Sequence, residues 1–153
     1  IMDGYTFELL KAFQPVRAGD YTVIPLPARH DDNENCFIFV IRKGGKTILY
    51  GNDTGMLYEE VFDYLKKEQI YFDMVSLDCT MVENPVSDEG THLGIDGDVR
   101  VLKRFRENGN IDDKTKLFAN HFSHNGNPMQ EHLESLLLPH GIMPAYDGLE
   151  VEL

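Results

Sequence analysis

Two histidines and an aspartate are the residues best suited to chemistry, because each follows a strand-like apolar run. Asp53 lies in the stretch 48–55, where an apolar run gives way to a small, polar, glycine-flanked turn. His30 precedes this stretch and His121 follows it, and both come after strand-like segments. Imidazole and carboxylate groups together suit zinc and other borderline divalent cations. The pattern therefore predicts a metal site carried on strand ends.

Asp78 and His92 extend this set of ligand-type residues. Asp78 ends another apolar run, and His92 lies just before a stretch with helical spacing. Loops at one edge of a sheet can converge on one point. A hydrolytic metal site needs neutral imidazoles, a carboxylate and one open position for water, which loses a proton near neutral pH and becomes the nucleophile.

The elements that must position these residues are short strands followed by alternating strands and helices. Apolar alternation, helical spacing and turn residues predict each segment. We expect strands at 5–13, 21–26, 36–42, 46–50, 72–77 and 116–119, helices at 56–68, 93–107 and from Pro128 to about 138, a turn at 14–20, and a final hairpin at 143–153. The strands at 21–50 should be consecutive and antiparallel. The pattern predicts an α+β fold, with a mixed, mostly antiparallel sheet and helices on one face.

Composition sets the broad class. The 153 residues are 42% hydrophobic, which suffices for one domain. A net charge of −12 argues against nucleic-acid binding by bulk electrostatics, although a bound metal could still hold a phosphate ester. No apolar run approaches the ~20 residues of a membrane span. Cys36 and Cys79 lie in apolar runs, so we expect free thiols and a cytoplasmic location.

Four stretches together resemble the C-terminal half of the metallo-β-lactamase superfamily. They are VIPLPARH (23–30), ILYGNDTG (48–55), FANHFSHN (118–125) and AYDGLEVEL (145–153). The resemblance implies half of an αββα sandwich and two divalent metal ions, zinc or manganese, in the intact protein. It implies His30, Asp53 and His121 as metal ligands, with Asp53 bridging the two ions.

Within the superfamily, the chain looks most similar to the phosphodiesterase branch of RNase Z and the cyclic-phosphate phosphodiesterases. An acidic residue and an extra histidine there protonate the leaving oxygen, which implies that Asp78 orients His92 as general acid. The alternatives are a strand-end cap for Asp78 and a helix-start residue without a role for His92.

The superfamily motif His-x-His-x-Asp-His of the N-terminal half is absent from these residues. We therefore expect residues 1–153 to be one domain-sized C-terminal half of a longer hydrolase, inactive by itself and holding one metal ion or none. Its expected partners are a small phosphate ester and either the missing N-terminal half or a second copy. The alternatives are a lactone, thioester or β-lactam hydrolase, or a non-catalytic chain that assembles through an exposed sheet face.

Overall fold

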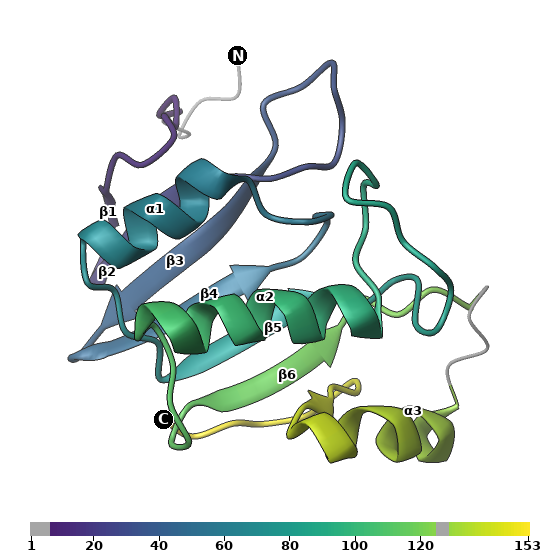
Figure 1. Ribbon diagram of the computed structural model, residues 1–153. Coiled ribbons are helices and arrows are strands. Elements are labelled where there is room, and N and C mark those ends of the chain that lie inside the picture. Colours follow the sequence, from purple (N-terminus) through teal and green to yellow (C-terminus); the bar gives the residue numbers. More distant parts are fainter. Residues whose placement is uncertain (1–6, 125–128) are drawn as a thin grey trace.

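The computed structural model describes residues 7–124 and 129–153. These residues form one sheet with helices packed on it (Figure 1). The strands are β1 (Val16–Ala18), β2 (Tyr21–Pro27), β3 (Phe37–Lys43), β4 (Lys46–Gly51), β5 (Met74–Asp78), β6 (Lys116–Asn120) and β7 (Met143–Pro144). The helices are α1 (Glu59–Lys67), α2 (Ile95–Asn108) and α3 (Gln130–Leu137), followed by a 3-10 turn at Leu138–His140. The helix start expected at Asn127-Pro128 lies outside the described residues.

The strands follow one another in the sheet in sequence order, β1 to β7. The pairs from β1 to β4 are antiparallel, and the pairs from β4 to β7 are parallel. The predicted mixed sheet and α+β class are confirmed, but the sheet is as much parallel as antiparallel. As a consequence β2, β4, β5 and β6 all run in the same direction, and their C-terminal ends meet at one edge.

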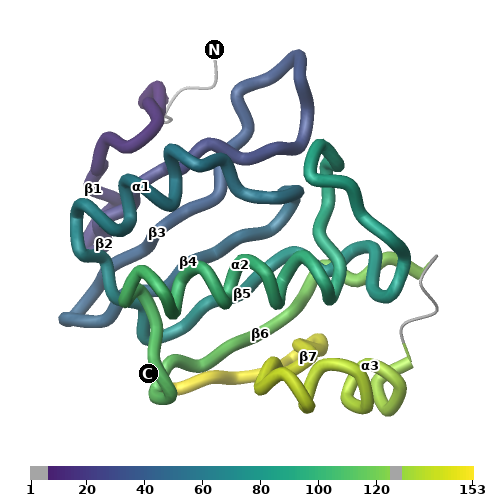
Figure 2. Tube along the Cα trace, in the orientation of Figure 1, coloured from purple at the N-terminus to yellow at the C-terminus, as the bar shows by residue number. Residues whose placement is uncertain are grey.

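The core lies between this sheet and the helices α1 and α2, which cover the same face (Figures 1 and 2). Helix α1 buries Val61 and Leu65, and α2 buries Val101 and Phe105. The Phe105 ring lies 5.7 Å from the ring of Phe72, centre to centre. Burial of side chains of this size stabilises the fold by about 1.5–3 kcal/mol each, so the helix face of the sheet is the stable platform under the strand ends.

Glycines in the left-handed conformation lie at the ends of several elements. The β3–β4 hairpin turns at Gly44 and Gly45, whose φ angles of 59° and 81° favour glycine. Helix α2 ends at Gly109, also in the left-handed conformation with φ of 77°. These glycines fix the hairpin that leads into β4 and the exit from α2.

Two predicted elements at the chain ends are wrong. Residues 7–13 are irregular, and the short strand β1 lies within the predicted turn. The Phe13 ring packs on Tyr64 of α1, 4.8 Å away, so burial against the helix outweighs extension of the sheet. At the other end, residues 145–153 form a turn but no strand after β7, which removes the expected hairpin.

The face of the sheet opposite α1 and α2 carries half-exposed apolar residues. Cross-strand register places Phe39 beside Tyr50 and Ile41 beside Ile48, and Ile48 in turn lies beside Met74. Tyr50 remains 46% exposed, although it lies in the middle of the sheet. Partly exposed apolar side chains in neighbouring strands make this face an apolar surface.

Among the described residues, no helix has the length and apolar character to cross a membrane.

Candidate metal centre

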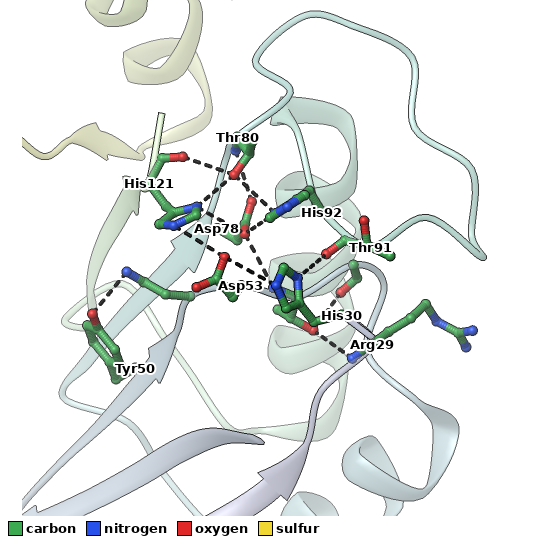
Figure 3. Close-up of polar contacts among 12 residues, drawn as sticks. Arg29, His30, Tyr50, Asp53, Asp78, Thr80, Thr91, His92 and His121 are labelled. Atoms are coloured by element: carbon green, nitrogen blue, oxygen red, sulfur yellow. Dashed lines mark hydrogen bonds and ion pairs between the residues drawn. The ribbon is translucent and has the colours of Figure 1, made fainter. Parts of the chain in front are cut away.

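The ends of four strands that run in the same direction deliver most of the candidate residues to one place (Figure 3). Asp78 is the last residue of β5, Asp53 follows β4, and His121 follows β6 directly. His30 comes shortly after β2, and His92 lies in the loop before α2. The structure thus brings together all five residues that the sequence singled out, from segments far apart in the chain.

Two imidazole rings lie near the same carboxylate oxygen of Asp53. Its Oδ1 lies 3.2 Å from Nε2 of His121 and 3.9 Å from Nε2 of His30. On the far side of the His30 ring, Nδ1 lies 3.4 Å from the carbonyl oxygen of Thr91. That carbonyl can only accept, so a hydrogen bond there places a proton on Nδ1, and Nε2 is the ring atom that faces Asp53.

Asp78 has a fully buried carboxylate that several donors satisfy. Its Oδ1 accepts the backbone N–H of Thr80 at 2.9 Å, and its Oδ2 accepts that of Thr54 at 3.3 Å. Its Oδ2 also lies 2.8 Å from Nδ1 of His92. A buried carboxylate with this many donors is held in a fixed orientation. Asp78 is therefore suited to orient imidazoles.

His92 uses one ring nitrogen for Asp78 and leaves the other for chemistry. Because an ionised carboxylate only accepts, the 2.8 Å contact requires the proton of His92 on Nδ1. The Nε2 atom is then the nitrogen able to hold or release a second proton. The His92 ring lies between its neighbours, 5.0 Å from the His30 ring and 5.8 Å from the His121 ring, centre to centre.

Backbone geometry fixes the two residues that follow β4 and β6. Asp53 has a φ of 51° and His121 a φ of 59°, both in the left-handed region. Such values are uncommon for residues other than glycine, with Asp and His among the better tolerated. Left-handed residues kept at strand ends are a feature of functional sites. Here they turn both side chains toward each other.

A close contact between glycines sets the position of the His92 loop. A Cβ added to Gly55 would lie 1.7 Å from the carbonyl oxygen of Gly90. The Gly55 N–H also donates to the carbonyl of Arg29 at 2.8 Å. The turn after Asp53 thus packs against the segments that carry His30 and His92, and only glycine permits this approach.

Four of these side chains form a compact group able to hold a metal ion. One ligand atom each from Asp53, Asp78, His92 and His121 lies within 4.8 Å of the others. Nitrogen and oxygen donors in this mixture fit zinc or manganese. Nε2 of His30 lies 3.9 Å from Asp53, but His30 is not part of this group of four.

Sequence reasoning missed Thr80, whose hydroxyl group contacts His92 and His121 together. Its backbone N–H bonds to the side chain of Asp78 two residues earlier, an Asx turn. A threonine two residues after a strand-end aspartate is the signal that points to it. Thr54 and Thr91 were likewise missed, because backbone atoms make their contacts with Asp78 and His30.

Cys79 follows Asp78 but points into the core. Both cysteines are free, and the Cys79 side chain is buried. Burial, followed by the neighbouring Asp98 carboxyl, raises the pKa of the Cys79 thiol far above its usual range. The Asp98 carboxyl is itself fully buried, and burial raises its pKa well above the ordinary value. The thiol therefore stays protonated and packs in the core.

Comparison with known proteins identifies the fold. No protein-family model and no curated protein sequence matches the chain. Among solved structures, the metallo-β-lactamase fold protein YhfI from Bacillus subtilis matches with a TM-score of 0.62 and 18% identity over 92% of this chain. Zn²⁺-bound PqqB from Methylobacterium extorquens matches with a TM-score of 0.65 and 16% identity over 94% of this chain.

The chain spans about half of these solved structures, 53% of YhfI and 55% of PqqB. At these identities the likeness concerns the arrangement of strands and helices and not a shared activity. Together with the strand order and the strand-end site, it shows that the chain adopts part of the metallo-β-lactamase fold.

Proposed function

We propose that the protein to which this chain belongs is a metal-dependent hydrolase, and that residues 1–153 form the C-terminal half of its metallo-β-lactamase-fold domain. The observation that carries the proposal is that ligand atoms of two carboxylates and two imidazoles lie within 4.8 Å of one another, beside the C-terminal ends of the parallel strands β4, β5 and β6. His30, Asp53 and His121 would hold divalent metal ions, zinc or manganese. When bound, such ions supply a Lewis acid and a water molecule that ionises near neutral pH.

For the substrate, we propose a phosphodiester or a cyclic phosphate, as in the RNase Z and cyclic-phosphate phosphodiesterase branch. The leaving group of such a substrate is an alkoxide, which needs a proton as the P–O bond breaks. Asp78 holds His92 through Nδ1 at 2.8 Å, which frees Nε2 to supply that proton. A partly exposed site, with the Asp53 side chain 50% exposed, gives a small phosphate ester access.

The direct test is hydrolysis of bis-(p-nitrophenyl) phosphate by the intact protein with added zinc or manganese. We expect turnover with at least one of the two metals and loss of turnover after chelation. Absence of turnover with any divalent metal would contradict the proposal. A panel of lactone, thioester and β-lactam substrates tests the other hydrolytic activities known for the same type of ligand set. Preference for one of them would replace phosphodiesters as the proposed substrate class.

The apolar sheet face opposite α1 and α2 supports a second proposal, which concerns assembly. Half-exposed Ile41, Ile48 and Met74 lie side by side there, and contiguous apolar surface of this kind marks an interface. We propose that the N-terminal half of the fold covers this face, and that a chain lacking that half associates with a second copy. A non-catalytic chain would associate without binding metal. Light scattering combined with metal analysis therefore distinguishes a metal-dependent hydrolase from a non-catalytic chain that only assembles.

A further inference from the structure

Thr80 touches both histidines beside Asp78 through a single hydroxyl group (Figure 3). Its Oγ1 lies 2.8 Å from Nδ1 of His121 and 2.9 Å from the carbonyl oxygen of the same residue. The same Oγ1 lies 3.2 Å from Nδ1 of His92. We propose that Thr80 is a positioning residue that keeps a proton on Nδ1 of His121 and thereby leaves Nε2 free for a metal ion. The inference rests on the proposed metal site for its effect on metal affinity.

The hydrogen of the Thr80 hydroxyl group can be assigned from its contacts. A hydroxyl group has one hydrogen to donate and two lone pairs to accept with. The carbonyl oxygen of His121 can only accept, so the 2.9 Å contact uses the hydrogen of Thr80. Toward the ring of His121, Oγ1 then has only lone pairs left. The 2.8 Å contact with Nδ1 therefore requires that Nδ1 carries the proton.

Two acceptor atoms lie near Nδ1 of His121. Besides Thr80 Oγ1, the carboxylate atom Oδ2 of Asp78 lies 3.5 Å away. His92 already donates its own Nδ1 proton to that carboxylate. Only acceptors therefore face Nδ1 of His121 among these contacts, which favours a proton there. Oδ1 of Asp53 is likewise an acceptor, 3.2 Å from Nε2, so a cation that binds between these two atoms takes the place of a proton on Nε2.

Thr80 also contacts the backbone of His121. His121 has a left-handed φ of 59°, which costs energy for a residue with a side chain. The hydrogen bond from Thr80 to the carbonyl of His121 holds this conformation, while the contact with Nδ1 orients the ring. One hydroxyl thus fixes the backbone, the ring orientation and the position of the ring proton.

The test compares Thr80→Val, which keeps the shape and removes the hydroxyl, with Thr80→Ser, which keeps the hydroxyl. The matched control is Thr115→Val, because Thr115 likewise donates its hydroxyl to a carbonyl, that of Phe72 at 2.9 Å. Thr115 precedes β6 and therefore lies at the opposite end of that strand from His121. Each variant is made in the intact protein that contains residues 1–153.

The first readout is the ¹⁵N NMR signal of the His121 ring in the metal-free protein at pH 8, above the ordinary imidazole pKa of about 6.5. We expect a protonated Nδ1 in the unmodified protein, in Thr80→Ser and in Thr115→Val, and a partly unprotonated Nδ1 in Thr80→Val. An unprotonated Nδ1 in the unmodified protein, or an unchanged signal in Thr80→Val, would overturn the inference.

The second readout is zinc affinity, measured by competition with a chelator. Loss of an outer partner of a metal-binding histidine lowers metal affinity by about 10- to 100-fold, and we expect this loss in Thr80→Val with recovery in Thr80→Ser. Equal zinc affinity in Thr80→Val and the unmodified protein would contradict the inference. If the unmodified protein binds no zinc, the proposed function fails, while the NMR result still decides the role of Thr80.

Discussion

Nε2 of His121 lies 3.2 Å from Oδ1 of Asp53, although the strands that precede them, β6 and β4, are separated in the sheet by β5. The two side chains meet because each residue turns into the left-handed conformation immediately beyond its strand or one residue later. Asp78, at the end of β5, lies beneath this contact with its carboxylate buried. The meeting of these two residues over β5 is the geometric basis of the candidate metal centre.

Replacement of either residue of this pair should weaken metal binding. We expect Asp53→Asn and His121→Ala each to lower zinc affinity by more than the roughly 10- to 100-fold typical of an outer partner, because each removes a ligand atom. The measurement is a zinc titration against a chelator. His132→Ala is the control, since His132 pairs with Glu83 at 2.9 Å outside the site. Equal losses in the control and in the two variants would exclude a specific site.

Replacement of His92 should affect substrates according to their leaving group. General acid catalysis contributes about 10²- to 10⁴-fold, and an alkoxide needs a proton more than p-nitrophenolate does. We therefore expect His92→Gln to lower kcat strongly on a 2′,3′-cyclic nucleotide and less on bis-(p-nitrophenyl) phosphate. The measurement is kcat on both substrates with zinc at saturation. Equal losses on both would indicate that His92 acts as a metal ligand instead of an acid.

Replacement of Gly55 should disturb the site through the backbone. The Cβ of Gly55→Ala would lie 1.7 Å from the carbonyl oxygen of Gly90, so the segment before His92 must move. We expect a loss of about 1–3 kcal/mol in the free energy of unfolding and a lower metal affinity.

The control for this prediction is Gly97→Ala in helix α2. Its Cβ would meet Cδ2 of Leu93 at 2.7 Å, which is the flexible end of a side chain, and alanine favours a helix by about 1 kcal/mol over glycine. Urea unfolding of both variants measures the difference. If Gly55→Ala is as stable as Gly97→Ala, the segment around Gly90 moves without a loss of stability.

The buried Asp98 should make stability depend on pH. Burial raises the pKa of Asp98 in the folded protein, so the folded chain keeps a proton that the unfolded chain releases. The stabilisation is full below the unfolded carboxyl pKa of about 3.9 and is lost as the pH rises toward the folded value. The slope is about 1.4 kcal/mol per pH unit within that window.

Asp98→Asn removes this titration, so its advantage in stability over the unmodified protein should grow as the pH rises. Urea unfolding between pH 4 and pH 8 provides the measurement. Parallel pH profiles of the two proteins would show that Asp98 does not titrate in this way.

A charge on the apolar sheet face should reduce association. Tyr50 is 46% exposed on that face. Association would bury a lysine at this position without a partner for its charge. We expect Tyr50→Lys to lower the fraction of associated chains in light scattering. Leu138→Lys is the control, because Leu138 is 52% exposed on the 3-10 turn after α3. If both variants associate equally, the sheet face is not the interface.

The sequence was sufficient to predict which strand ends carry ligand-type side chains, because apolar runs that stop at Asp53, Asp78 and His121 are local patterns. It could not show that β4, β5 and β6 pair in parallel, since strand pairing depends on contacts distant in sequence. The predicted mixed sheet and the metallo-β-lactamase fold are confirmed.

The missed elements have particular causes. Residues 7–13 alternate like a strand, but Phe13 takes a left-handed φ of 64° and packs against Tyr64 of α1. Thr80 was missed because the Asx-turn pattern shows a threonine near Asp78 but not its contacts with His92 and His121. The roles assigned to His30, Asp53, His121, Asp78 and His92 remain predictions that the experiments above address.

The Gly44-Gly45 turn offers a practical handle on this protein. It opens β4 at the end opposite to Asp53, so the length of a strand separates it from the histidines. Exposed loop tips accept inserted residues. A short peptide tag placed there would attach the molecule to a bead in one orientation, with the candidate metal centre facing the solution.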